Sequence, residues 1–152
     1  MDVLCSQLVL SGVPVWRSAW ALQPKAGNQF GRGVFWTEGK PVIDQEYDHD
    51  ELVRDRFQQS PFRVLLFGGE PIRRRLLDPD CPMDFPILDD LRPAGATDYV
   101  ALPVRLMDGR IHATTWSTKD DFGFDNNHIA MLEAVNDQMA LLFELWEATD
   151  RS

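Results

Sequence analysis

Two segments near the N-terminus alternate large and small or polar residues with the period of two that marks a half-buried strand. They span residues 15–23 and 30–37, and the turn-forming stretch from Pro24 to Gly27 between them predicts a hairpin. The first strand divides into two faces, one with Trp16, Ser18, Trp20 and Leu22, the other with Val15, Arg17, Ala19 and Ala21.

A second hairpin is expected in the C-terminal half, and it leads into a long helix. Its strands span residues 99–106 and 110–117, and the tight turn between them favours a left-handed Gly109. Asp125 is the expected N-cap of a helix that runs to Glu147. Apolar residues at three- and four-residue steps form one stripe on this helix: Ile129, Leu132, Val135, Met139, Leu142, Phe143 and Trp146. Such a stripe packs on a core or extends as a dimer stalk.

Shorter elements connect the two hairpins. Apolar spacing and polarity predict three further helices, over residues 3–10, 44–59 and 85–91. Asp84 is the expected N-cap of the last of these helices. Residues 62–67 form an apolar run short enough for a strand or one buried turn, and residues 72–77 predict a short strand.

The order of these elements predicts an α+β fold in a single domain that spans residues 1–152. A central, mainly antiparallel sheet of about five or six strands is flanked by the N- and C-terminal helices. This layout is similar to that of GAF domains and, as the second choice, PAS domains. In both, a sheet face can enclose a ligand beneath the middle segments.

Composition and charge limit the partners of the protein. The chain has 152 residues, of which 44% are hydrophobic and 11% aromatic, enough to build a core. Its formal net charge is −9, so we expect binding neither to nucleic acid nor to anionic membrane surfaces. We also expect no membrane-spanning segment, a soluble cytoplasmic protein, and two free buried thiols at Cys5 and Cys81.

Catalytic and metal chemistry has little support in the sequence. His49, His112 and His128 have no partner at metal-ligand spacing, and the acidic stretch 48–51 around His49 suits a solvated helix start better than a metal site. The glycine pairs at 31–33 and 68–69 lack the residues of a dinucleotide or phosphate loop. No nucleophile elbow surrounds any serine. We therefore expect no catalytic residues, no metal and no cofactor.

Two groups of residues remain as candidates for binding. Arg73-Arg74-Arg75 is the basic run; it suits ion pairing within an acidic protein, or one arginine that grips a carboxylate, a phosphate or a partner. Aromatic residues either fill the core or line an apolar pocket. His112 shares a strand face with Thr114 and Trp116. Our candidate ligand-binding residues are Trp36, Tyr99, His112 and Trp116.

Several ordered pieces of the chain resemble the N-terminal sensory region of bacterial class III adenylate and guanylate cyclases. They are residues 60–62, 72–76, 84–88, 95–103, 108–109 and 123–124, and the piece that begins Gly95-Ala96-Thr97-Asp98 is the strongest. The resemblance implies a GAF-like regulatory region that precedes a catalytic domain within a dimeric enzyme. It implies no catalysis by this chain, and it carries over no ligand residues.

The first hypothesis is therefore a sensory domain, of a nucleotide cyclase by resemblance. It would relay the binding of a small molecule or partner through its terminal helices, which also form a homodimer, to a downstream catalytic dimer. The alternative is a dimerisation or protein-interaction module without a ligand, which a filled interior would favour. A small stand-alone enzyme is the third hypothesis, and it requires converging titratable groups in a cleft.

Overall fold

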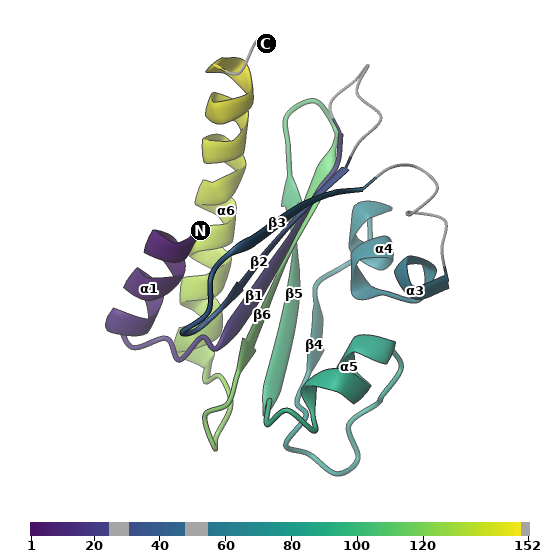
Figure 1. Cartoon of the computed structure of the whole chain (residues 1–152), viewed down its shortest axis with the longest axis vertical. Coiled ribbons are helices and arrows are strands. Elements are labelled where there is room, and N and C mark those ends of the chain that lie inside the picture. The colour runs from purple at the N-terminus through teal and green to yellow at the C-terminus, as the bar shows by residue number, and fades with distance from the viewer. Residues whose placement is uncertain (25–30, 48–54, 150–152) are drawn as a thin grey trace.

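A six-stranded antiparallel sheet forms the centre of the molecule in a computed structural model, which describes residues 1–24, 31–47 and 55–149. The strand order across the sheet is β3-β2-β1-β6-β5-β4 (Figure 1). The strands are β1 Arg17–Leu22, β2 Gly31–Thr37, β3 Ile43–Tyr47, β4 Ile72–Arg74, β5 Asp98–Arg105 and β6 Ile111–Thr118.

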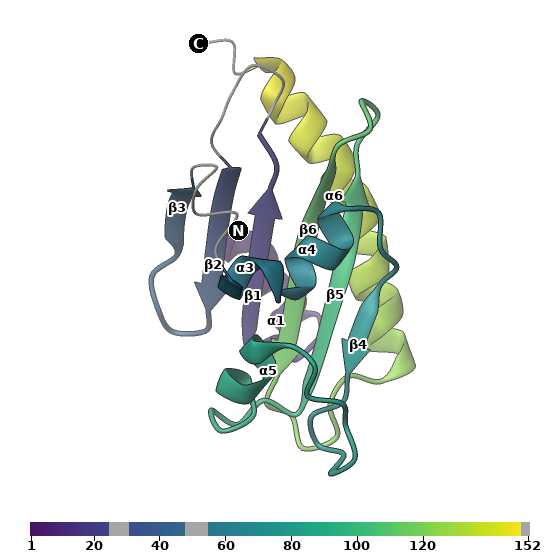
Figure 2. The same cartoon turned by 90° about the vertical axis from the view of Figure 1, so that its right-hand side faces the viewer.

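Helices cover both faces of this sheet. The terminal helices α1 (Asp2–Leu10) and α6 (Asn126–Thr149) lie side by side on one face. The short helices α3 (Asp55–Gln58), α4 (Pro61–Leu66) and α5 (Pro86–Leu91) lie over the other, as Figure 2 shows. The predicted α+β fold with a mainly antiparallel sheet and flanking terminal helices is confirmed.

Both predicted hairpins form, and they meet at the centre of the sheet. β1 pairs with β2, and β5 pairs with β6, each in antiparallel register. β1 also pairs with β6, which places Arg17 opposite Ser117 and Ala19 opposite Thr115. Gly109 takes the predicted left-handed conformation in the β5–β6 turn, with φ of 92°. The predicted turn at Pro24 to Gly27 lies mostly outside the described residues.

Large side chains fill the space between the sheet and the terminal helices. Trp20, Trp36 and Trp116 on the strands pack with residues of α6 such as Leu132 and Phe143 in one buried cluster. Full burial of an apolar side chain of this size stabilises a fold by about 1.5–3 kcal/mol. This cluster therefore holds the terminal helices on the sheet.

One buried polar network crosses this core. Asn136 of α6 donates from Nδ2 to the carbonyl of Pro103 at 2.7 Å, and its Oδ1 accepts from Thr114 Oγ1 at 2.6 Å. Trp116 Nε1 donates to the same Thr114 hydroxyl at 3.0 Å. Because these buried polar groups have partners, their hydrogen bonds offset the cost of desolvation, and the network fixes the register of α6 on the sheet.

The long helix begins as predicted but presents only part of the predicted stripe to the core. The backbone N–H of His128 donates to Asp125 Oδ1 at 2.8 Å, so Asp125 is the N-cap. A second hydrogen bond joins the same two residues, since His128 Nδ1 accepts from the Asp125 backbone N–H at 3.0 Å. Leu142 and Trp146 are 60% and 47% exposed, so of the two roles that the sequence left open for the stripe, packing on the core does not apply to them.

The predicted helix over residues 44–59 is wrong at its start. Residues 43–47 form β3, an edge strand that pairs with β2. Four of its five residues are exposed, so its sequence lacks the alternation that identifies a half-buried strand. Residues 48–54 lie outside the described part, and residues 55–58 are helical.

The apolar run at 62–67 is helical, which decides between the two alternatives that its length left open. Pro61 occupies the first turn of α4, where its missing N–H has no cost. Asp84 was wrong as an N-cap: Phe85 is the N-cap of α5, and the Asp84 carboxylate pairs with Arg74 instead. Cys5 and Cys81 are free and buried, as predicted.

Candidate ligand-binding site

A cavity of about 480 Å³ lies between the sheet and the short helices, on the face opposite α6. Its floor consists of small residues, since Ala19, Ala21 and Gly33 line it from adjacent strands. Pro61, Phe62, Leu66 and Ile87 line it from α4 and α5. Because these strand residues have small side chains, a space remains between the sheet and the helices that cover it. Cavities of this size hold small organic ligands.

Aromatic side chains form much of the wall. Phe35, Tyr47, Phe57, Phe62 and Tyr99 all line the cavity. They favour a flat apolar ligand, because rings bury a large area and stack on one another.

Gly33 allows two of these rings to approach the sheet. A Cβ atom at this position would lie 2.7 Å from Cε2 of Tyr47 and 3.1 Å from Cε2 of Phe35. Real Cβ atoms do not approach a ring carbon as closely as 2.7 Å, so any other residue would displace the Tyr47 ring.

A polar corner adjoins the cavity where β1, β6 and β5 run side by side. The strand register aligns Arg17, Ser117 and Tyr99 in one row, and Thr115 lies next to this row. Burial lowers the pKa of Arg17, while Tyr99 and Asp90 act to raise it. Burial raises the pKa of Tyr99, and the nearby Arg17 and a hydrogen bond with Thr115 oppose this.

Of the four predicted ligand residues, the structure places only Tyr99 at this cavity. Trp36, His112 and Trp116 belong to the opposite face of the sheet, toward the terminal helices. Trp36 Nε1 donates to Asp2 Oδ1 of α1 at 2.8 Å, and Trp116 is fully buried. The residues predicted together are thus divided between a packed core and a cavity, and ligand contact by Tyr99 stays a prediction.

His112 has a different environment from the one expected at a ligand. Its Nδ1 accepts from the backbone N–H of Gln23 at 3.0 Å, so the proton of the neutral ring resides on Nε2. Nε2 lies 3.5 Å from Glu147 Oε1 of α6, and the ring meets Phe143 edge-on at 5.2 Å. Burial lowers the pKa of His112, and Glu147 opposes this only in part.

Phe35 and Phe62 were among the aromatic residues considered for a pocket, but the sequence analysis missed other cavity residues, chiefly Arg17, Tyr47 and Thr115. A signal for them exists in the sequence. The face of the first strand with Arg17, Ala19 and Ala21 has small residues where a packed face has large ones, and Gly31 and Gly33 repeat this on the second strand. Two adjacent strands with small residues on one face indicate a space above the sheet.

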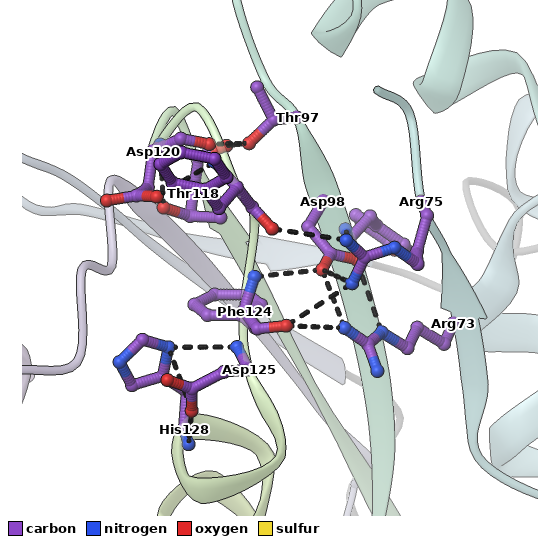
Figure 3. Close-up of polar contacts among 11 residues, drawn as sticks. Arg73, Arg75, Thr97, Asp98, Thr118, Asp120, Phe124, Asp125 and His128 are labelled. Carbon is purple, nitrogen blue, oxygen red and sulfur yellow. Dashed lines mark hydrogen bonds and ion pairs between the residues drawn. The ribbon is translucent and has the colours of Figure 1, made fainter. Parts of the chain in front are cut away.

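The arginine run forms ion pairs around a buried carboxylate. Asp98 is fully buried, and its Oδ2 accepts from Arg73 Nη2 at 2.8 Å and from Arg75 Nη1 at 3.3 Å. The same oxygen accepts from the backbone N–H of Phe124 at 2.9 Å, and Oδ1 accepts from the N–H of Tyr99 at 3.0 Å. Figure 3 shows this carboxylate between the two guanidinium groups and the segment that leads into α6. Ion pairing within the protein, one of the two predicted roles, therefore accounts for Arg73 and Arg75.

Gly123 completes this cluster. It takes a left-handed conformation with φ of 73°, and a Cβ there would lie 2.8 Å from Asp98 Oδ2. Asp98, Arg73, Gly123 and Phe124 all belong to the pieces that resemble cyclase sensory regions. Three of the pieces, 72–76, 95–103 and 123–124, therefore meet at the start of α6, whereas the pieces 60–62 and 84–88 contribute Phe62 and Ile87 to the cavity.

Neither a cluster of metal ligands nor a helix that could cross a membrane is found in the described part of the chain. Residues 1–24, 31–47 and 55–149 contain no group of three histidine, cysteine, aspartate or glutamate side chains placed to hold a metal ion. The acidic stretch 48–51 lies outside these ranges. No helix within them has the length and apolar character needed to cross a membrane.

Comparison with known proteins identifies the fold. No protein-family model matches the sequence, and no curated protein matches it either. Among solved structures, the GAF domain of a two-component sensor histidine kinase from Bacillus halodurans superposes with a TM-score of 0.65 at 17% identity, over 97% of this chain and 96% of that one. The fold is that of a GAF domain.

Two further GAF structures agree with this assignment. A GAF domain from A. aeolicus in an inactive state has a TM-score of 0.61 at 12% identity, over 95% of this chain and 82% of that one. The phycocyanobilin-bound GAF domain of a cyanobacterial phytochrome has a TM-score of 0.60 at 12% identity, over 99% and 87%. At these identities the likeness shows the GAF fold alone.

Proposed function

We propose that residues 1–152 form one sensory domain of a signalling protein, which binds a small molecule in the cavity and transmits its occupancy through α6. The cavity of about 480 Å³, with its aromatic wall, is the observation that carries this proposal. A ligand-free interaction module has no need of such a space. The phytochrome GAF domain, described as phycocyanobilin-bound, is one case in which this fold holds a small molecule.

Gln23 offers a physical route from the cavity to α6. Its side-chain Nε2 donates to the carbonyl of Leu66 in α4 at 3.2 Å, and Gln23 itself lines the cavity. Its backbone N–H donates to His112, which lies 3.5 Å from Glu147 near the end of α6. A ligand that shifts α4 would thereby change the support of α6 on the opposite face. The two states must differ in their affinity for the ligand for this coupling to operate.

Native mass spectrometry of the freshly purified protein tests the binding proposal. We expect either a retained small molecule or, when the protein is screened against a small-molecule library, compounds that raise its melting temperature. The variant Ala21→Phe fills the floor of the cavity and should abolish both signals. Met107→Phe, at an exposed position in the turn between β5 and β6, is the control and should retain them. Equal ligand retention by the two variants would contradict the proposal.

The outer face of α6 supports a second proposed property, a homodimer through the terminal helices. Leu141, Leu142 and Leu145 are 59%, 60% and 55% exposed, and Met131 lies two heptads before Leu145. Apolar residues at this spacing pair helices in a coiled coil. Figure 1 shows that the C-terminal part of α6 extends beyond the N-terminal end of α1, so α1 does not cover it. The same face would serve the alternative function, a dimerisation module without a ligand.

Light scattering tests the homodimer. We expect a dimer for the native chain and a monomer for the double variant Leu141→Glu, Leu145→Glu, because each new carboxylate would be buried beside its own copy in the partner. Asp137→Ala, an exposed change elsewhere on α6, should remain dimeric. A native chain that stays monomeric at high concentration would contradict the homodimer and leave the ligand proposal intact.

The regulated enzyme, in our proposal, is a class III nucleotide cyclase. The support is the ordered set of sequence pieces that resembles such cyclases, of which 72–76, 95–103 and 123–124 meet at Asp98 at the start of α6. The test joins α6 in helical phase to a bacterial class III adenylate cyclase catalytic domain and measures cyclic AMP formation. We expect the fusion with Ala21→Phe to differ in rate from the native fusion. Identical rates would count against regulation of a cyclase by this domain.

A further inference from the structure

Arg17 is a partly buried cation beside the cavity that has no directly bonded partner in the described part of the chain. It lines the cavity from the start of β1 and is only half-exposed. Within the described part of the chain its guanidinium makes no hydrogen bond or ion pair. Asp90 and Tyr99 are the groups that act on it electrostatically, and Asp90 is exposed on α5. A partly buried guanidinium without a bonded partner has an unfavourable environment unless an anion joins it.

Arg32 also lies at the edge of the cavity, but its guanidinium is bound elsewhere. Its Nε donates to Asp44 Oδ1 at 2.8 Å, and its guanidinium lies 5.1 Å from the centre of the Trp146 ring on α6. Arg32 is thus directed to the opposite face of the sheet and is already paired. Of these two arginines, Arg17 is the one with capacity for a ligand.

Hydroxyl groups surround the Arg17 position. Ser117, directly opposite Arg17 on β6, is fully buried, and its Oγ has no hydrogen-bond partner. Tyr99 lies opposite Ser117 on β5, and the Thr115 Oγ1 accepts from the backbone N–H of Ala19 at 3.2 Å. A buried hydroxyl without a partner is uncommon in a folded protein and indicates a missing acceptor or donor. The Arg17 guanidinium and the unpartnered Ser117 hydroxyl at one corner are donors of the kind that an anionic group requires.

We propose that the ligand of this cavity is a small aromatic organic anion. Its carboxylate, phosphate or sulfonate group lies at Arg17, with the hydroxyl groups of Ser117 and Tyr99 nearby, and its ring lies among Phe35 and Phe62. The inference rests on the proposed ligand-binding function and adds the chemical class of the ligand. It gives Arg17 the role of the residue that selects an anion over a neutral ring of the same shape.

Two fluorescent dyes of matched shape test this selection. 8-Anilinonaphthalene-1-sulfonate carries an anionic group, and N-phenyl-1-naphthylamine has the same ring system without it. We expect one equivalent of the sulfonate to bind the native chain at least tenfold more tightly than the neutral dye. Arg17→Met should remove this preference by weakening the sulfonate alone, and Arg17→Lys should retain part of it. Arg105→Gln, which changes an exposed arginine on β5 away from the cavity, is the control and should bind as the native chain does.

A displacement series identifies the kind of anion. Phenyl phosphate and phenylacetate are added to the dye complex, with phenylacetamide as the neutral counterpart of phenylacetate. Displacement by either anion at concentrations where the amide has no effect supports the proposal and separates phosphate from carboxylate. Circular dichroism of each variant establishes that it is folded.

The outcomes separate this inference from the proposed function. If Ala21→Phe does not reduce binding of either dye, or if neither dye binds, the cavity is not a binding site and both proposals fail. If Ala21→Phe abolishes binding while both dyes bind equally well and Arg17→Met changes neither, the cavity binds ligands but the anion inference is overturned.

Discussion

The two faces of the sheet come from the same strands but differ in what they hold. Toward α6, alternate positions carry large residues, among them Trp20, Trp36, Trp116 and Leu102, and the interior is filled. Toward α4, the intervening positions carry small residues, among them Ala19, Ala21 and Gly33, and a cavity of about 480 Å³ remains. Alternation of large and small residues along the same strands can therefore give the sheet a packed core on one face and a cavity on the other.

The difference also assigns different tasks to the faces. The packed face fixes α6, because removal of buried volume leaves a cavity that the surroundings fill only in part. The cavity face has its space already open, so changes there alter what can be bound more than how stable the fold is. The structure connects the faces at few points, of which Gln23 and His112 form one.

The largest expected effect lies at the charged end of the packed face. Asp98→Ala should lower the free energy of unfolding by about 3–5 kcal/mol, because it leaves two arginines and the start of α6 without their buried acceptor. Asp84→Ala removes the exposed partner of Arg74 and should cost about 1 kcal/mol or less. Urea unfolding of the two variants measures the difference, and similar values would show that the cluster is not an anchor.

The next effect compares two leucines on α6. Leu132 is fully buried in the packed face, and Leu142 is 60% exposed. Leu132→Ala should cost about 2–5 kcal/mol, and Leu142→Ala about 0.5 kcal/mol or less in the monomeric double variant described above. Chemical denaturation provides both numbers. A costly Leu142→Ala change in a monomer would mean that this residue packs on the domain itself.

The smallest expected effect is a pH dependence of the free energy of unfolding that arises from His112, which connects the two faces through Gln23. Burial lowers the pKa of His112 below its usual value of about 6.5, so the folded state takes up this proton less readily than the unfolded state. The contribution of His112 to the free energy of unfolding is therefore fully present above pH 6.5. It decreases as the pH falls through 6.5 toward the pKa of His112 in the folded state. His112→Asn can still accept from Gln23 and should reduce this slope.

Urea midpoints between pH 7.5 and 5.5 measure that slope. Glu147, Arg110 and Asp108 are the charged groups near His112, and hydrogen bonds with Arg110 hold the pKa of Glu147 below its usual value although burial acts to raise it. Carboxylates of this kind titrate at lower pH than the window chosen. An unchanged slope in His112→Asn would assign the pH dependence to other groups.

Periodicity predicted the elements whose two faces differ. The hairpins of residues 15–37 and 99–117, and the helix that begins at Asp125, follow from alternation and from a capping residue. The strand at 43–47 was missed because it lies at the edge of the sheet and most of its residues are exposed. For such a strand the hydrogen bonds to β2 decide the structure, and these are not visible in local sequence.

The cavity was less accessible to prediction than the fold. Tyr99 lines the cavity, and it was chosen as a candidate because an aromatic residue on a central strand is prominent; its contact with a ligand stays a prediction. Arg17 was not chosen, because its significance depends on residues far away in the sequence, such as Ser117 and Asp90. A cavity is a property of side chains that are small in several strands at once, and only the strand register brings them together.

Gly33 gives the site an adjustable size. Because two aromatic rings rest against its bare backbone, one added methyl group would tilt the Tyr47 ring away from the sheet. Related chains could therefore change which molecules fit by a single exchange of glycine for alanine, with the packed side of the sheet untouched. Ligand preference in such a domain would be able to diverge faster than its architecture.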